Sequence, residues 1–122
     1  MEQRKAQRYK MQLPLEILQL GEHRLHRTER TRDISSGGVC FLSTNSIEPG
    51  GRIEYVITLS GSNPPVKIRC LGKVLRSKKP QTEVVAETPF EVAVTMERYS
   101  FVRPGELEQL IANGNSQNNL TH

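Results

Sequence analysis

The sequence predicts an all-β fold, an antiparallel barrel or sandwich that is completed by one short helix. Most of the chain alternates apolar and polar residues with a period of two, which is typical of strands with one buried face. Turn signals rich in Gly, Pro, Ser and Asn recur roughly every ten residues, and helical periodicity is confined to one segment near the end. With 122 residues, the chain has the length of one domain.

The first three strands are predicted in the N-terminal third of the chain. The first covers residues 13–20, with Pro14 near its start, where a missing N–H is tolerated. A glycine and a glutamate then turn the chain into a second strand over residues 23–34. Residues 39–42 form a short apolar run between turn signals, which indicates a buried third strand.

Two further strands follow in the middle of the chain. Residues 53–59 are the segment richest in β-branched and aromatic residues, and residues 60–65 form a loop of Ser, Gly, Asn and Pro. In residues 66–75 apolar side chains alternate with mostly basic ones, so the outward face of this strand is cationic. Residues 77–89 are ambiguous between a loop and a short strand.

The C-terminal third contains a last strand, a helix and a tail. Residues 90–97 alternate as a strand with one buried face, and residues 106–112 form a helix with acids in its first turn. The tail, residues 113–122, is too polar to bury itself and is predicted to be disordered. The resulting domain organisation is a flexible arm (1–12), a barrel with its helix (13–112) and this tail.

Charge is distributed unevenly along a chain whose net charge is +4. Basic residues gather in residues 1–10 and 67–79, whereas acids dominate residues 80–122. This asymmetry predicts an anionic partner on one side of the molecule. No stretch is apolar enough to span a membrane or to act as a signal peptide, so we expect a cytoplasmic protein without membrane insertion.

Residues that could hold a metal or perform catalysis are scattered. Cys40 and Cys70 lie in apolar stretches without Cys-x-x-Cys spacing, and the three histidines are far apart or terminal. We expect buried free thiols, no metal site and no cofactor. Neither a nucleophile motif nor a phosphate-binding glycine loop occurs, so we expect no enzymatic activity.

Two short motifs nevertheless stand out. Arg4 and Arg8 form an Arg-x-x-x-Arg pair just before the first strand, and Asp33, Ser35 and Gly38 form an Asp-x-Ser-x-x-Gly turn before the third. Each motif alone has a structural explanation. Arginines occur in solvated basic tails, and Asp, Ser and Gly build tight turns.

In combination, the two motifs resemble the PilZ domain family of cyclic di-GMP receptors. Residues 72–76 resemble the Gly-x-Val strand of that family, and residues 90–99 resemble its final apolar strand, so the likeness covers residues 3–103. The resemblance implies a six-stranded antiparallel barrel with a C-terminal helix. It also implies a bacterial second-messenger receptor that holds cyclic di-GMP between the N-terminal arginines and the barrel surface.

The chemistry of these five residues suits that ligand. Arginine can fork onto a phosphate, reach the O6 and N7 atoms of guanine and stack on a purine, which fits Arg4 and Arg8. Asp33 can accept hydrogen bonds from guanine or hold an arginine, and the Ser35 hydroxyl can bond a phosphate or a base edge. Asp33 and Ser35 should face the same way, and Gly38 would let ligand or backbone approach closely.

Three further candidates are Gln3, Lys5 and Arg76, for which a solvated surface position is the alternative. Gln3 stands where many PilZ sequences carry another arginine. Since glutamine stacks on guanine less well than arginine, both a single ligand and a self-intercalated pair of ligands remain open.

The resulting hypothesis is a cyclic di-GMP adaptor whose arm orders over the ligand and signals to an unidentified downstream protein. One alternative is a small basic barrel that binds RNA or single-stranded DNA through residues 67–79. This basic segment has no aromatic residue for base stacking, which disfavours nucleic acid as a partner. Another alternative, a degenerate PilZ domain that only makes protein contacts, is disfavoured by the complete set of motif residues.

Overall fold

The predicted strands are present in the computed structural model, which describes residues 7–79 and 89–112. The strands of the structure are β1 (Tyr9–Lys10), β2 (Pro14–Leu20), β3 (His23–Ile34), β4 (Gly38–Ser43), β5 (Arg52–Leu59), β6 (Val66–Lys78), β7 (Phe90–Thr95) and β8 (Arg98–Phe101), of which β1 and β8 were not predicted. A helix over residues 106–112 follows them, as predicted. Gln3, Arg4, Lys5, part of the ambiguous segment (80–88) and the tail (113–122) lie outside the described residues.

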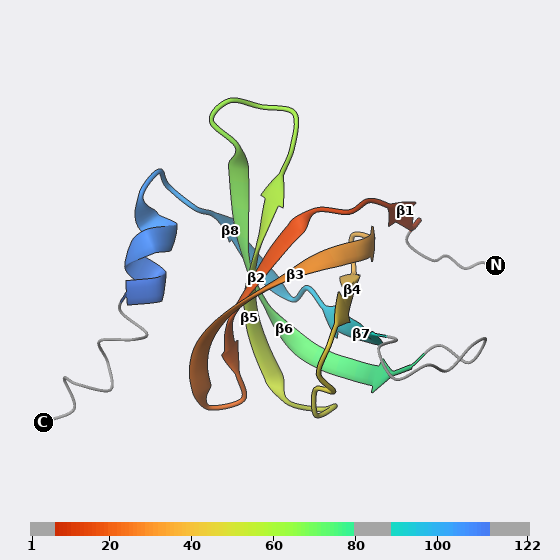
Figure 1. Cartoon of the computed structure of the whole chain (residues 1–122). Coiled ribbons are helices and arrows are strands. Elements are labelled where there is room, and N and C mark those ends of the chain that lie inside the picture. Colours follow the sequence, from red (N-terminus) through yellow and green to blue (C-terminus); the bar gives the residue numbers. More distant parts are fainter. Residues whose placement is uncertain (1–6, 80–88, 113–122) are drawn as a thin grey trace, which may run out of the picture.

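Six of these strands close into an antiparallel barrel (Figure 1). Their order is β3-β2-β5-β6-β7-β4, and the pairing between β4 and β3 closes the ring. The two remaining strands are extensions, because β1 pairs only with the end of β3 and β8 pairs with the first half of β6. The barrel with its C-terminal helix confirms the predicted fold class and decides between barrel and sandwich.

Side chains that alternate along the strands fill the barrel. The largest fully buried ones inside the barrel are Tyr55, Phe41, Leu15, Ile17, Ile53, Val92 and Val94. The hydroxyl of Tyr55 donates to the backbone oxygen of Thr95 at 2.9 Å, so this polar atom is satisfied inside the core. The period of two seen in the sequence is thus the pattern of inward-facing positions.

The helix packs on the outer wall of the barrel. Leu107 lies with Leu18 and Val56 in a second buried cluster, which Leu110 and Ile111 border. Leu18 follows the inward-facing Ile17, so regular alternation directs it outward, and the β-bulge between Ile17 and Gln19 shifts the register of β2 only beyond that point. Leu18 and Val56 thus give the helix an apolar surface on which to pack.

The structure differs from the sequence-based boundaries at three places. The strand predicted over residues 66–75 continues to Lys78, because Ser77 and Lys78 still pair with β7. The strand predicted over residues 90–97 ends at Thr95, and β8 begins three residues later on another part of β6. Within the predicted arm, Tyr9 and Lys10 form β1, a strand that local alternation does not reveal because it is only two residues long.

Both cysteines, Cys40 and Cys70, are free and buried. Burial raises the pKa of Cys70 to about 12 and also raises that of Cys40. Since burial disfavours the thiolate, only about one Cys70 in ten thousand would be ionised at pH 8. We expect both thiols to react with an aromatic disulfide reagent much more slowly in the native protein than in the denatured protein. Rapid labelling of either thiol in the native protein would contradict this prediction.

Candidate functional site

The turn between β3 and β4 is organised by Ser35. Its backbone N–H donates to the oxygen of Gly38 at 2.9 Å, and its Oγ accepts from the N–H of Gly37 at 3.3 Å. The Oγ also lies 3.4 Å from the Gly38 oxygen, a long and weak contact. The serine therefore builds the turn through its backbone and keeps a hydroxyl that can reorient.

Asp33 lies at the end of β3 and holds two arginines. Its Oδ1 accepts from Nη1 of Arg8 at 2.7 Å, and its Oδ2 accepts from Nε of Arg32 at 3.0 Å and also lies 3.0 Å from Nη2 of the same arginine. The Asp33 side chain is 7% exposed, whereas that of Arg8 is 57% exposed. The carboxylate is thus buried and paired, and the arginine that it anchors still faces solvent.

Arg32 extends this chain of charges. Its Nη1 lies 2.6 Å from Oε2 of Glu91, so one guanidinium links β3 to β7. The hydrogen bond to Asp33 is the main cause that raises the pKa of Arg32. Arg32 consequently fixes the position of Asp33, which in turn orients Arg8.

A hollow of about 110 Å³ lies beside these residues. It is lined by Arg8, Ser35, Gly37, Gly38, Val39, Cys40, Leu75, Arg76, Ala93 and Val94. The structure therefore brings together four of the predicted candidates, from the arm, the turn and β6. A volume of this size takes part of a dinucleotide, such as one phosphate group or base edge, and the remainder would lie over the surface.

Asp33 is not among the residues that line the hollow. The sequence analysis expects it to face the same way as Ser35, but its carboxylate is turned onto the two guanidinium groups. It reaches the hollow only through Arg8. Arg4, Gln3 and Lys5 lie outside the described residues, so their part in the site stays a prediction.

Among the residues of this site that the sequence analysis did not single out, Arg32 and Leu75 both lie at β-bulges. The register of β3 against β4 shifts between Thr31 and Asp33, which brings Arg32 beside its own neighbour in sequence. The register of β6 shifts between Val74 and Arg76, and Leu75 is exposed at the hollow. Bulges are common beside functional sites, but strict alternation hides them in a sequence.

Gly38 has a packing role in the barrel. A Cβ atom at this position would collide with the backbone oxygen of Val94, which lies on the neighbouring strand β7. A Cβ atom at Gly72, in the segment that resembles the Gly-x-Val strand, would likewise collide with the backbone oxygen of Thr95. Both glycines allow β7 to approach its neighbours closely.

The model of the PilZ domain family matches residues 2–112. The chain belongs to the PilZ domain family. PilZ domains are typically receptors for cyclic di-GMP without catalytic activity.

A solved structure with a similar fold is that of the Bacillus subtilis inhibitor of motility (MotI/DgrA). The TM-score is 0.66 at 15% sequence identity, over 100% of this chain and 55% of that chain. At this identity the likeness shows the shared fold, and this PilZ domain spans about half the length of that protein. A search of curated proteins finds no match.

No group of three or more His, Cys, Asp or Glu side chains in residues 7–79 and 89–112 is placed to hold a metal ion. In the same part of the chain, no helix has the length and apolarity needed to cross a membrane.

Proposed function

We propose that this PilZ domain binds cyclic di-GMP at the hollow between its N-terminal arm and the turn over residues 35–37. Membership of the family supports the identity of the ligand. The convergence of Arg8, Ser35, Gly38 and Arg76 on one hollow, with Asp33 anchoring Arg8, is the observation that supports the place.

The contacts of Asp33 favour one of the two roles that the sequence left open. Both of its oxygens already accept from guanidinium groups, so it is suited to hold Arg8 rather than to accept from guanine. The exposed guanidinium of Arg8 can then fork onto a phosphate or onto O6 and N7 of a guanine. Arg76 and the Ser35 hydroxyl supply further donors across the hollow, and Leu75 offers an apolar surface for a base.

The arm is held mainly by polar contacts. Besides the ion pair of Arg8 with Asp33 and the two pairs of β1 with β3, Met11 donates its N–H to the oxygen of Arg32 at 3.2 Å. Tyr9 is 55% exposed and Met11 is 45% exposed, so little apolar surface stabilises this segment. Ligand phosphates would add charge-assisted bonds, and the ordered arm would form the surface that a downstream protein recognises.

Isothermal titration calorimetry with three ligands tests this function. We expect cyclic di-GMP to bind with a measurable enthalpy, and GTP and a single-stranded oligonucleotide to bind much more weakly at the same salt concentration. Binding of the oligonucleotide alone would favour the nucleic-acid alternative. Within that basic segment, Arg69 is committed to Glu54 at 2.6 Å, which removes one of the cations that this alternative would use.

Amide hydrogen exchange tests the proposed ordering of the arm. On addition of cyclic di-GMP, protection should rise together at residues 7–12 and 33–38, because the ligand would bridge these segments. The interior strand β5, which does not line the hollow, serves as the internal control and should not change. An arm that is fully protected without ligand, or that exchanges rapidly at saturation, would exclude arm ordering as the signal.

A further inference from the structure

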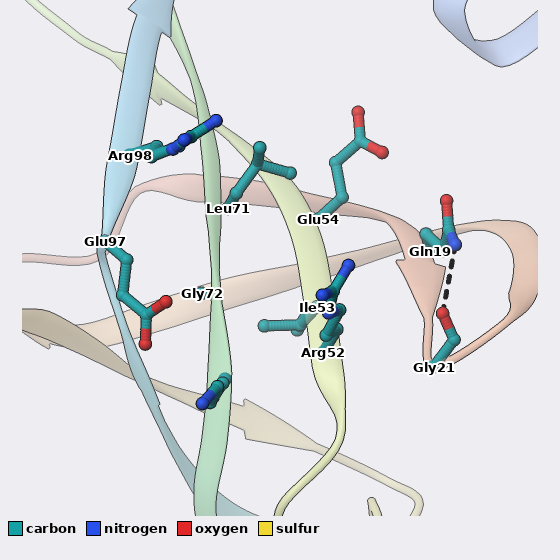
Figure 2. Close-up of a pocket in the computed structure, with 10 residues that line it drawn as sticks. Gln19, Gly21, Arg52, Ile53, Glu54, Leu71, Gly72, Glu97 and Arg98 are labelled. Carbon is teal, nitrogen blue, oxygen red and sulfur yellow. Dashed lines mark hydrogen bonds between the residues drawn. The ribbon is translucent and has the colours of Figure 1, made fainter.

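A second and larger pocket, of about 610 Å³, crosses the outer face of β5 and β6 (Figure 2). Glu97 and Arg98 lie on one side of it, and Gln19 and Gly21 lie on the other. The full lining is Gln19, Gly21, Arg52, Ile53, Glu54, Leu71, Gly72, Lys73, Glu97 and Arg98. None of the residues proposed to bind cyclic di-GMP lines this pocket, so it is a separate feature of the surface.

Three cations of this pocket have no acidic partner. Arg52, Lys73 and Arg98 are exposed, and none forms an ion pair within the described part of the chain. Glu54, an acid of the same pocket, pairs with two other arginines, Arg24 at 2.9 Å and Arg69 at 2.6 Å. It therefore does not neutralise any of the three exposed cations.

The remaining acid of the pocket, Glu97, has a local contact of its own. Its Oε2 accepts from Oγ1 of Thr95 at 3.0 Å. Three cations against this single free carboxylate leave the pocket with a net positive charge.

Two of these cations stand directly opposite each other. Arg52 of β5 and Lys73 of β6 are register partners in the antiparallel ladder. Like charges at such positions destabilise a sheet, because their side chains emerge about 5 Å apart. An anion seated between them would relieve the repulsion, which indicates that the pair is suited to binding rather than to stability.

A neighbouring hollow of about 200 Å³ extends the pocket along β6 and β8. It shares Leu71 and Arg98 with the first pocket and adds Arg69, Tyr99 and Ser100. Leu71 is 38% exposed and Tyr99 is 65% exposed. We name the combined surface of Arg52, Leu71, Lys73, Arg98 and Tyr99 the basic groove.

We propose that the basic groove docks an acidic peptide segment of a downstream protein. Its carboxylates would pair with Arg52, Lys73 and Arg98, and an apolar side chain between them would pack on Leu71 and Tyr99. The two adjoining hollows and the mixture of arginine with apolar and aromatic residues fit a peptide better than a compact anion. The proposal rests on the proposed function, because it assigns the surface through which the receptor meets its partner.

One short segment, residues 94–98, connects the basic groove with the proposed ligand site. Val94 lines the hollow beside Arg8, whereas Glu97 and Arg98 line the groove. Between them, Met96 donates its N–H to Gly37 at 3.0 Å, and Glu97 donates its N–H to Leu71 at 2.9 Å. The end of β7 thus contacts the turn of the ligand site and the floor of the groove.

Thermal unfolding separates a binding role of these cations from a structural one. Arg52→Gln should leave the midpoint of unfolding unchanged or raise it, because the substitution removes a repulsion with Lys73. The matched variant Arg69→Gln should lower the midpoint by several degrees, because it removes a partner of the buried Glu54. A loss of stability in Arg52→Gln as large as that in Arg69→Gln would assign Arg52 a structural role.

The docking test is a titration of the full chain, followed by amide chemical shifts, with the capped peptide Glu-Glu-Leu-Glu-Glu. Shifts should concentrate on the residues of the basic groove, and the neutral peptide Gln-Gln-Leu-Gln-Gln should cause none there. The triple variant Arg52→Gln, Lys73→Gln, Arg98→Gln should lose at least about tenfold in affinity. The variant Arg30→Gln, Lys67→Gln, Arg103→Gln removes the same charge elsewhere and should retain binding.

Three outcomes would overturn the proposal. They are the absence of shifts at millimolar peptide, shifts spread over every basic surface, and displacement of the peptide by an equal concentration of inorganic phosphate. The triple variant should still bind cyclic di-GMP like the unchanged protein. A protein that binds the acidic peptide but not cyclic di-GMP would refute the proposed function alone, and the reverse result would refute the docking proposal alone.

Discussion

Arg8→Ala is expected to weaken the binding of cyclic di-GMP at least about tenfold. Each charge-assisted hydrogen bond from the guanidinium to the ligand contributes about 1.5 to 3 kcal/mol, and a fork makes two. The fold should persist, because Arg8 is exposed and precedes β1. Without it, Asp33 keeps its hydrogen bond and ion pair with Arg32, which continue to neutralise its charge.

Two further variants sharpen this test. Lys10→Ala removes one positive charge from the same arm, at an exposed position with no ion pair among the described residues, and should change the affinity little. Arg8→Lys keeps the charge but loses the fork, so its affinity should fall between those of the unchanged protein and Arg8→Ala. If Arg8→Ala binds within about twofold of the unchanged protein at fixed salt, Arg8 is not a ligand residue.

The strands of this domain were predictable wherever one face of the strand is buried. Alternation located the six barrel strands, because inward and outward positions differ in polarity. It gave no sign of β1, which is too short, or of β8, whose four residues are all exposed. The start of β8 depends on how β7 crosses β6 near Gly72, which is a tertiary contact without a local signature.

Some residues of the proposed site were likewise predictable from the sequence, and others were not. The contact between Arg8 and Asp33 joins two motifs that lie 25 residues apart in sequence, and the family resemblance led to both. Arg32 carries no comparable signal, since a regular strand would direct it away from Asp33. The basic groove was visible only as a cationic outward face, because the opposition of Arg52 and Lys73 requires the register of β5 and β6.

Gly38→Ala and Gly72→Ala are each expected to lower the free energy of unfolding by about 1 to 3 kcal/mol. In both cases the added methyl group would meet a backbone oxygen of β7, that of Val94 or of Thr95. A backbone oxygen inside a paired strand cannot swing aside as a flexible side chain could, so the barrel itself must shift. Both sites described above should suffer, because the end of β7 borders each of them.

Chemical denaturation of these two variants measures the effect, and Gly37→Ala is the matched control. A Cβ atom at Gly37 would meet no atom within 4 Å, although this residue also lines the hollow. Gly37→Ala should therefore change the stability by less than about 0.5 kcal/mol. If Gly38→Ala proves as stable as Gly37→Ala yet loses cyclic di-GMP, the glycine serves the approach of the ligand instead of the packing of β4 against β7. If Gly38→Ala and Gly72→Ala lose stability and Gly37→Ala does not, both glycines serve the contact that holds β7 between its neighbours.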